Sequence, residues 1–226
     1  DELSVSVEEL TQVTPGIPVA ACFGDGAFTI PDFSPPTATW SGSGVDSNGS
    51  VDPSLSPGTY NLVIENGVGS CFTSATSSFT IHPLPTPAIS APAELCEGTA
   101  FQIGATEPNG ASLQWTFDAT APALVDTVAG NTDMTFEALA VSNEGCESSV
   151  QWSVTVNPLP DVEAGIPEVF CNQTIPSVLP NGTPTNGTWT GPGVTDPAGT
   201  FLPSAAGLGQ VTLTYTFTDA FGCTNN

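Results

Sequence analysis

Six cysteines recur at a fixed spacing, and this repetition constrains the fold of the 226-residue chain more than any other feature. Three cysteines open successive units and three close them, with 74 and 75 residues between openers and 75 and 77 between closers. A fixed period of this kind is the signature of a repeat architecture. The opening cysteines are Cys22, Cys96 and Cys171, and the closing cysteines are Cys71, Cys146 and Cys223.

Units of this size bury little apolar surface, so disulfide bonds are an expected supplement to each core. The repeat leaves two pairings open. In the favoured pairing each unit closes on itself, which leaves no thiol unpaired: Cys22 with Cys71, Cys96 with Cys146, and Cys171 with Cys223. In the other pairing neighbouring units are linked through Cys71 with Cys96 and Cys146 with Cys171, and Cys22 and Cys223 bond to partners outside the chain. Paired cysteines predict an oxidising compartment, outside the cell.

The charge of the chain excludes several classes of function. It has 23 acidic residues, no Lys and no Arg, and a formal net charge of -23. Binding of nucleic acid through neutralised phosphates is excluded, because no cationic side chain is present to release counterions. No apolar stretch reaches the length of a membrane-spanning helix, so direct insertion into a membrane is not expected either.

Alternating apolar residues predict strands throughout the chain, and no segment shows a convincing helical period. Val211, Leu213, Tyr215 and Phe217 alternate with threonines, which is typical of a half-buried strand. One Trp follows each opening cysteine by 18 or 19 residues, and a Cys, Trp, Cys order is typical of an immunoglobulin-like sandwich. The predicted fold class is therefore all-β, an elongated tandem array of three small immunoglobulin-like β-sandwich domains. The predicted core tryptophans are Trp40, Trp115 and Trp189.

Proline-rich segments predict the boundaries of the units, because proline cannot continue a ladder and makes a stiff, extended connector. Repeat one is assigned to residues 15–85, repeat two to 86–160, and repeat three to 161–226. Residues 1–14, in which Leu3, Val5 and Val7 alternate with polar residues, are expected to be the last strand and linker of a preceding unit. Repeat three is expected to lack its final strand. Either the protein continues, or the amino-terminal strand of another copy completes the sheet.

Two motifs resemble those of a known class of repeat. Thr188-Trp189-Thr190-Gly191-Pro192-Gly193-Val194 is echoed by Thr39-Trp40-Ser41-Gly42-Ser43-Gly44-Val45, and Val154-Thr155-Val156-Asn157-Pro158-Leu159-Pro160 ends repeat two. In these motifs the chain resembles the Ig-like and PKD-like repeats of giant cell-surface proteins of Bacteroidota, including gliding-motility adhesins. Repeat two departs from the first motif, with Thr116-Phe117-Asp118-Ala119 after its Trp. The resemblance implies type IX secretion, a long surface stalk or filament, and no catalysis by the repeats.

Calcium is the one cofactor that the residues suggest, because hard cations bind clustered oxygen ligands. Asp46, Asn48 and Asp52 lie in a loop-like run, although this run lacks the Glu that completes an EF-hand loop. A solvated turn is the competing interpretation. Further carboxylates gather at the second junction, where a cation between extracellular repeats would bind; they are Asp161, Glu163 and Glu168.

Other candidate residues carry weaker signals. His82 is the single histidine and stands beside a Pro-Leu-Pro linker, so a Ser-His-Asp triad is not expected and the chain is interpreted as not an enzyme. Asp126-Thr127-Val128 fits the short pattern used for O-glycosylation in Bacteroidota, which the resemblance makes relevant to Thr127.

These observations lead to one main functional hypothesis and two alternatives. The main hypothesis is a non-catalytic stalk or spacer segment of a long extracellular cell-surface adhesin or filament. The alternatives are a fibre subunit that polymerises by donating a strand from residues 2–10, and a carbohydrate- or protein-binding module that uses an exposed aromatic such as Phe33 or Phe221. The expected partners are neighbouring repeats, other copies, and surface glycans or proteins.

Overall fold

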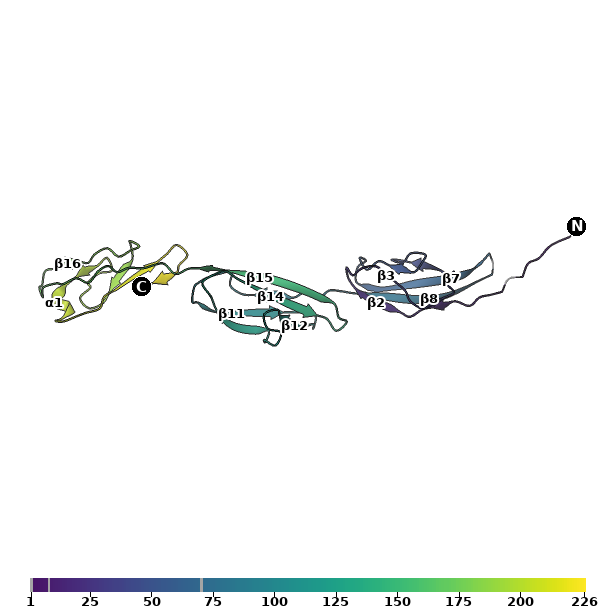
Figure 1. Cartoon of the computed structure of the whole chain (residues 1–226), viewed down its shortest axis with the longest axis horizontal. Coiled ribbons are helices and arrows are strands. Elements are labelled where there is room, and N and C mark those ends of the chain that lie inside the picture. Colours follow the sequence, from purple (N-terminus) through teal and green to yellow (C-terminus); the bar gives the residue numbers. More distant parts are fainter. Residues whose placement is uncertain (1, 8, 70) are drawn as a thin grey trace. The chain divides into compact units, whose positions relative to one another are not determined.

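The structure is a computed structural model that describes residues 2–7, 9–69 and 71–226. Strands joined by turns make up almost all of its regular structure (Figure 1), and the helix α1 (Pro203–Ala206) is a single turn. The predicted all-β fold of small immunoglobulin-like units is therefore confirmed. Among the described residues, no helix has the length and apolar character needed to cross a membrane.

Repeat one is built around a four-stranded sheet in which β8 lies between two partners. It pairs in parallel with β2 and antiparallel with β7, and Figure 1 shows these three strands side by side. Strand β7 pairs with β5 on its other edge, and β1–β4 and β3–β6 form two further pairs. The strands are β1 (Thr14–Pro15), β2 (Val19–Cys22), β3 (Phe28–Thr29), β4 (Phe33–Ser34), β5 (Thr39–Gly42), β6 (Ser50–Val51), β7 (Gly58–Val68) and β8 (Cys71–His82).

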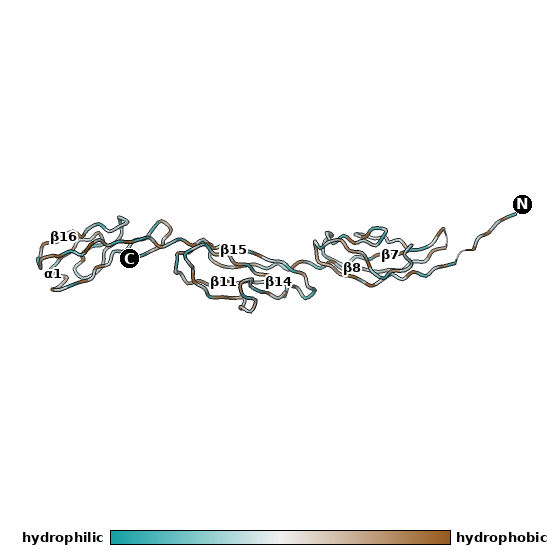
Figure 2. Tube along the Cα trace, in the orientation of Figure 1, coloured by the Kyte–Doolittle hydropathy of each residue, from teal (hydrophilic) through white to brown (hydrophobic). Residues whose placement is uncertain are grey.

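The core of repeat one follows the alternation of its central strands, since successive side chains of a strand point to opposite faces. Figure 2 shows hydrophobic and hydrophilic residues interleaved along the chain. Trp40 is buried and lies opposite Ile64 in the β5–β7 register. Phe79 and Ile81 of β8 are also buried, and the ring of Phe79 stacks on that of Tyr60 with centroids 5.0 Å apart. Strand β8 thus provides core residues as well as the middle of the sheet.

Repeat two has the same parallel pairing at its opening cysteine. Strand β10 pairs in parallel with β15, as β2 does with β8. A four-stranded sheet has the order β10-β15-β14-β12, a three-stranded sheet has the order β13-β11-β9, and Trp115 on β12 is buried. The strands are β9 (Ala88–Ser90), β10 (Glu94–Cys96), β11 (Ala100–Thr106), β12 (Ser112–Trp115), β13 (Leu124–Val128), β14 (Met134–Val141) and β15 (Glu147–Asn157).

Repeat three forms a smaller set of strands around a core of Leu179, Trp189, Phe201 and Tyr215. Trp189 lies opposite Tyr215, as Trp40 lies opposite Ile64 in repeat one. The sheets have the orders β17-β19-β20 and β16-β18. The strands are β16 (Ser177–Val178), β17 (Thr188–Thr190), β18 (Thr200–Phe201), β19 (Thr214–Thr218) and β20 (Thr224–Asn225).

The strand predicted from Val211 to Phe217 begins later in the structure, at Thr214. In repeat one, the corresponding start of β7 is held by the far half of β8, where Gly58 pairs with Ile81 and Tyr60 with Phe79. In repeat three, β19 is held by β17 and by the two-residue β20. Residues 211–213 therefore have no ladder partner among the described residues.

The chain divides into two compact units, and the division passes through repeat two. The first unit comprises Asp1–Ala88, Ala105–Thr120 and Ala138–Val150, and the second comprises Ile89–Gly104, Ala121–Glu137 and Gln151–Asn226. The predicted repeat boundaries are not tested by this division and stay a prediction.

The described residues before β1 run without regular secondary structure. Thr73 Oγ1 donates a hydrogen bond of 2.6 Å to the carbonyl oxygen of Thr11, and Val13 packs against the core of repeat one. Further toward the amino terminus, Leu3, Val5 and Val7 are 90%, 75% and 92% exposed. The chain therefore joins repeat one near Thr11, and the three alternating apolar side chains before it lie in solvent.

Candidate functional site

Two disulfide bonds join different repeats, so both predicted pairings are wrong. Cys22 is bonded to Cys146 and Cys96 to Cys223, and the Cα atoms are 5.5 Å apart in each pair. Cys71 and Cys171 are exposed free thiols. The opening cysteine of one repeat is thus bonded to the closing cysteine of the next, an arrangement that neither prediction included.

The geometry of β8 explains why repeat one does not close on itself. Cys22 ends β2 and lies beside His82, the last residue of β8, whereas Cys71 begins the same strand. Eleven residue steps at about 3.3 Å each separate the two ends of β8 by about 36 Å. A disulfide bond needs Cα atoms about 4.4 to 6.8 Å apart, which that separation excludes.

Each bonded opening cysteine lies where the chain leaves its own repeat. Cys22 is in register with His82, and Cys96 is in register with Asn157, immediately before the Pro-Leu-Pro segments. The next amide continues the pattern, since Phe23 N donates to His82 O and Glu97 N donates to Asn157 O, both at 2.9 Å. The sulfur atom is thereby held beside the linker to the following repeat.

Each bonded closing cysteine lies at the end of a capped hairpin turn. Ser142 Oγ accepts a hydrogen bond from Cys146 N at 3.2 Å, and Asp219 Oδ1 accepts one from Cys223 N at 2.8 Å. Side-chain oxygens of Ser and Asp commonly close turns in this way. The hairpin of repeat one differs, because Gly67 stands four residues before Cys71 and provides no such cap.

Asn157 has a buried polar side chain at the second junction. Its Nδ2 atom donates a 2.7 Å hydrogen bond to Glu94 Oε1, and its carbonyl oxygen lies 4.0 Å from Cys223 Sγ. Beyond it, Asn225 Nδ2 donates to Pro160 O at 2.9 Å. The disulfide, an amide and a linker carbonyl therefore lie together, all within the second compact unit.

Glu107 is a junction residue that sequence reasoning missed. Its carboxylate accepts hydrogen bonds from the amides of Asn109 at 2.7 Å, Ala111 at 3.0 Å and Thr86 at 3.2 Å. Desolvation acts to raise the pKa of Glu107, but the hydrogen bonds from Ala111, Thr86 and Asn109 lower it below its ordinary value. The sequence feature that could have identified Glu107 is Glu-Pro-Asn-Gly, a turn whose acidic residue also accepts a hydrogen bond from the linker.

The two aspartates among the predicted calcium ligands of repeat one accept hydrogen bonds from backbone amides of their own turns. Asp46 Oδ1 accepts hydrogen bonds from Ser50 N at 2.8 Å and Asn48 N at 3.0 Å, and Asp52 Oδ1 accepts one from Ser54 N at 2.9 Å. Hydrogen bonds from Ser54 lower the pKa of Asp52. Asp46, Ser50 and Asp52 also line a shallow cavity of about 270 Å³.

The counterpart turn in repeat three has the same design. Asp196 Oδ1 accepts hydrogen bonds from Ala198 N at 2.9 Å and Thr200 N at 3.3 Å. Hydrogen bonds from Thr200, first from its side chain and then from its backbone, lower the pKa of Asp196. The structure therefore uses these aspartates as turn caps in both repeats.

The carboxylates of the second junction do not gather around one point. Asp161, Glu163 and Glu168 are exposed, and the backbone of Glu163 exchanges hydrogen bonds with Thr183. Within the part of the chain that the structure describes, no group of three or more His, Cys, Asp or Glu side chains is placed to hold a metal ion. Calcium binding stays a prediction.

The remaining candidate residues lie apart from one another. Thr127 is half-buried on β13 opposite Phe101, and its glycosylation stays a prediction. Phe221 is 67% exposed on the hairpin before Cys223. Phe33 is only half-exposed, because its ring packs edge-on against Trp40 with centroids 5.7 Å apart, so it is not a free stacking surface.

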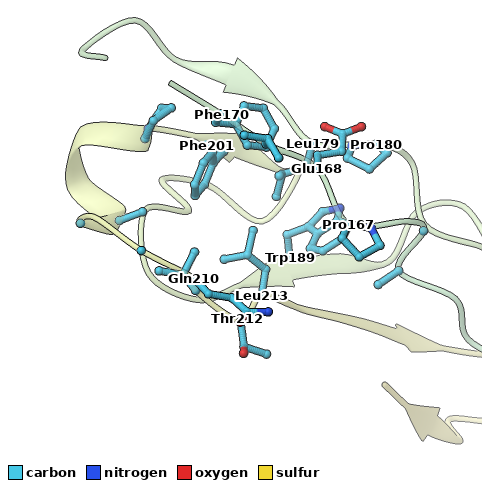
Figure 3. A pocket seen from close by; sticks show the side chains of 18 of the residues that line it. Pro167, Glu168, Phe170, Leu179, Pro180, Trp189, Phe201, Gln210, Thr212 and Leu213 are labelled. Carbon is cyan, nitrogen blue, oxygen red and sulfur yellow. The ribbon is translucent and has the colours of Figure 1, made fainter. Parts of the chain in front are cut away.

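An apolar groove of about 670 Å³ opens on repeat three. Figure 3 shows the side chains that surround it, which come from residues 164–170, from the core, and from residues 206–213. The apolar ones that define its floor and walls are Phe170, Leu179, Trp189, Phe201 and Leu213.

The place of this groove in the fold matches that of β8 in repeat one. There, β8 separates β2 from β7. In repeat three, the residues before Cys171 and residues 207–213 occupy the positions of β2 and of the start of β7, and both segments line the groove. Two equivalent glycines support this correspondence between the repeats. A Cβ atom on Gly42 would touch Leu62 in repeat one, and a Cβ atom on Gly191 would touch Leu213 in repeat three. The groove thus has the location and the apolar lining that a central strand requires.

Comparison with known proteins identifies no family model and no curated protein that matches this chain. Several solved structures match it at low identity and low TM-score. A glucan-utilisation protein, SGBP-B of Bacteroides ovatus, solved with a mixed-linkage heptasaccharide, is 15% identical over 91% of this chain, with a TM-score of 0.23. The chain spans 61% of the length of that protein.

Two further solved structures match the chain at similarly low identity. The insect immune protein hemolin is 14% identical, with 85% of this chain and 68% of hemolin covered and a TM-score of 0.31. Fibronectin(III)-like modules of Clostridium thermocellum CbhA are 11% identical, with 65% and 94% covered and a TM-score of 0.31. At these values the likeness carries no argument about function.

Proposed function

We propose that this chain is a non-catalytic stalk segment of a long extracellular adhesin or filament, whose role is to transmit tension without extending far. The observation that carries the proposal is the pairing of the cysteines, because each disulfide bond spans two repeats. A bond within one sandwich would stabilise that sandwich alone. A bond from one repeat to the next also limits how far the two can be pulled apart.

The two disulfide bonds shorten the covalent path between the chain ends. The shortest path runs through residues 1–22, crosses to Cys146, returns to Cys96 and crosses again to Cys223, so it contains about 77 of the 226 residues. At about 3.5 Å per extended residue, this path reaches about 270 Å, whereas the reduced chain reaches about 790 Å. The remaining residues form loops that carry no tension.

Force spectroscopy on single molecules tests the proposal. The chain is pulled from its two ends with and without a reducing agent. We expect the maximum end-to-end extension, called the ceiling below, to be about 270 Å and to rise about threefold on reduction. The double variant Cys96→Ser/Cys223→Ser leaves a path of residues 1–22 and 146–226, for which we expect a ceiling of about 360 Å. The matched control Cys71→Ser/Cys171→Ser keeps both bonds, so its ceiling stays that of the parent chain. A ceiling that reduction does not change contradicts the proposal.

The proposed setting is the surface of a bacterium of the Bacteroidota, reached by type IX secretion. The support is the resemblance of the Trp-x-Gly-x-Gly and Val-x-Val-Asn-Pro-Leu-Pro motifs, together with disulfide bonds, which persist in oxidising compartments. Detection of the chain by antibody on intact cells of a producing strain, and its loss from the surface when type IX export is disabled, is the expected result. Retention inside untreated cells contradicts it.

A second candidate function is a fibre subunit that polymerises by strand donation. The observation that favours it is the apolar groove of repeat three, at the position that β8 takes in repeat one. Strand addition to an open sheet is an established mode of association between protein chains. Fibres in negative-stain micrographs that disappear when residues 2–10 are deleted would support this candidate, and fibres that persist without them would contradict it.

A further inference from the structure

The two free thiols occupy positions that are bonded elsewhere in the chain. Cys146 and Cys223 each bond to the opening cysteine of the preceding repeat, and Cys71 is the closing cysteine of repeat one. Cys22 and Cys96 each bond to the closing cysteine of the following repeat, and Cys171 is the opening cysteine of repeat three. Cys71 and Cys171 are therefore complementary halves of the same kind of bond.

The alternating residues near the amino terminus are in register with the last strands of the repeats. Val5 and Val7 stand 17 and 15 residues before Cys22. Phe79 and Ile81 stand at the same distances before Cys96, and Val154 and Val156 before Cys171. Those four residues are buried in their repeats, whereas Val5 and Val7 are exposed.

The groove of repeat three has the chemistry to receive such a strand. Most of its lining residues are apolar, with Glu168, Gln210 and Thr212 among the polar ones, and the segments on either side of it correspond to the two strands that enclose β8 in repeat one. Val169, on one rim, is 99% exposed, and Ile166 and Leu208 are also largely exposed. Burial of these side chains by an incoming strand with apolar residues at alternate positions would remove apolar surface from water, which favours docking.

We propose that repeat three of one copy of this chain receives residues 2–7 of a second copy, and that Cys171 of the first copy then bonds to Cys71 of the second. The register supports both contacts at once. Phe79 and Ile81 are buried in repeat one, and repeat two follows them in the chain. The closing cysteine of repeat two, Cys146, is bonded to Cys22, the opening cysteine of repeat one. A donated strand carrying Val5 and Val7 is likewise followed by a repeat whose closing cysteine is Cys71.

The bond forms by oxidation of two thiols. The Cys171 and Cys71 thiols lose two protons and two electrons to oxidised glutathione, whose disulfide is reduced to two glutathione thiols. Exchange proceeds through a mixed disulfide with one of the two cysteines, which the second thiolate then attacks. Docking of the strand places the two sulfur atoms at the high effective concentration of an intramolecular reaction.

The inference rests on the second candidate function, association of copies by strand donation, and its test is separate from that of the stalk function. Variant Cys71→Ser retains only the Cys171 thiol, and variant Cys171→Ser retains only the Cys71 thiol. Each is incubated with a glutathione redox buffer, alone and as an equal mixture, and the products are separated without reduction. We expect the mixture to give the mixed dimer at least tenfold more rapidly than either variant alone gives a symmetric dimer.

The strand contact is tested in the copy that supplies Cys71. The double variant Val5→Asp/Val7→Asp in that copy is expected to lower the rate of mixed-dimer formation at least tenfold, because charged residues would enter the apolar groove. The matched control is Ser4→Asp/Ser6→Asp, which adds the same charge on the other face of the alternation and is expected to slow it less than threefold. In the dimer, amides of residues 207–213 in the receiving copy should exchange more slowly with deuterium.

Three outcomes overturn the inference. They are symmetric dimers that form as fast as the mixed one, equal rates for the two aspartate variants, and a bond between Cys71 and Cys171 within one copy of the parent chain. The extension ceiling of about 270 Å depends only on the other four cysteines, so failure of the copies to join leaves the stalk proposal intact. Conversely, loss of that ceiling would leave the joining of copies unaffected.

Discussion

Cys22 and Cys146 are covalently joined although 124 residues separate them in the sequence. The first lies at the end of β2, where repeat one meets its outgoing linker, and the second lies at a hairpin end in repeat two. Cys96 and Cys223 repeat this relationship 127 residues apart. Since both bonds link consecutive repeats, they act on the connection between repeats as well as on the stability of each one.

The pairing predicts how many thiols react. The unfolded, unreduced chain should take up two alkyl groups, on Cys71 and Cys171, and six after reduction. Trypsin has no cleavage site in a chain without Lys or Arg, so peptide mapping needs a protease specific for acidic or aromatic residues. Mass spectrometry of the unreduced digest should find Cys22 linked to Cys146 and Cys96 to Cys223. A link between Cys22 and Cys71 would contradict the structure.

Replacing Gly49 or Gly199 should destabilise the repeat that contains it. Both have a positive φ, and a Cβ atom at either would lie 2.8 Å from the indole of Trp40 or Trp189. We expect Gly49→Ala and Gly199→Ala to lower the free energy of unfolding by about 1 to 3 kcal/mol, from strain and overpacking together.

The matched control for these glycines is Gly110→Ala. Gly110 also has a positive φ, but a Cβ atom there would meet nothing within 4 Å. The control isolates the cost of the backbone conformation, about 1 kcal/mol. Unfolding in denaturant, followed by tryptophan fluorescence, measures the difference. Equal losses in all three variants would show that the contact with the indole is unimportant.

The turn at Asp196 should contribute stability that depends on pH. Its pKa is held below the ordinary value of 3.8 by hydrogen bonds from Thr200, so the folded state binds fewer protons than the unfolded state. That contribution is present above pH 3.8 and is lost as the pH falls through the lower pKa of the folded state. Wild type should therefore melt at a higher temperature than Asp196→Asn near pH 6, and the difference should shrink as the pH falls below 3.8.

Net charge requires a control in that experiment, because protonation also relieves repulsion in a chain of charge -23. Asp161→Asn removes one charge from an exposed position and serves as the reference. The melting temperatures of Asp196→Asn and Asp161→Asn should differ near pH 6 and converge in acid. A difference between them that stays constant from pH 6 to pH 3 would contradict the role of the Asp196 carboxylate.

Replacing the side-chain amide of Asn157 should lower the free energy of unfolding. Its buried side chain donates to Glu94 Oε1 beside the Cys96 to Cys223 bond. We expect Asn157→Asp to cost about 1 to 3 kcal/mol, because it replaces a donor with a second carboxylate. Asn157→Ala, which adds no charge, should cost less. Thermal unfolding at pH 7 and pH 4 separates repulsion from lost packing, since protonation should reduce only the cost of the aspartate variant.

Much of the fold could be predicted from local patterns. Trp40, Trp115 and Trp189 are buried, and strands follow the alternation of apolar residues wherever a partner strand is present. The turns at Asp46 and Asp196 correspond as the aligned sequences indicate. These features depend on neighbours within a few residues or on one strand partner, which a repeated sequence displays directly.

The pairing of the cysteines could not be predicted in the same way. Spacing gives the period, but it does not say that Cys22 lies beside the end of β8 whereas Cys71 lies at its start. The parallel pairing of β2 with β8 decides this, and no local residue pattern distinguishes parallel from antiparallel partners here. The late start of β19 has a similar cause, because Val211 and Leu213 have the alternation of a strand but lack the neighbour that would hold them.

The overlap of the two disulfide loops has a consequence for survival among proteases. The loops share residues 96–146, so cleavage of any one peptide bond between Cys22 and Cys223 leaves the chain in one piece. Separation of the two ends requires at least three cleavages, one in each of the stretches 22–96, 96–146 and 146–223. A single polypeptide thereby gains the redundancy of three parallel backbones, and a nick that would sever an ordinary tandem protein leaves this one continuous.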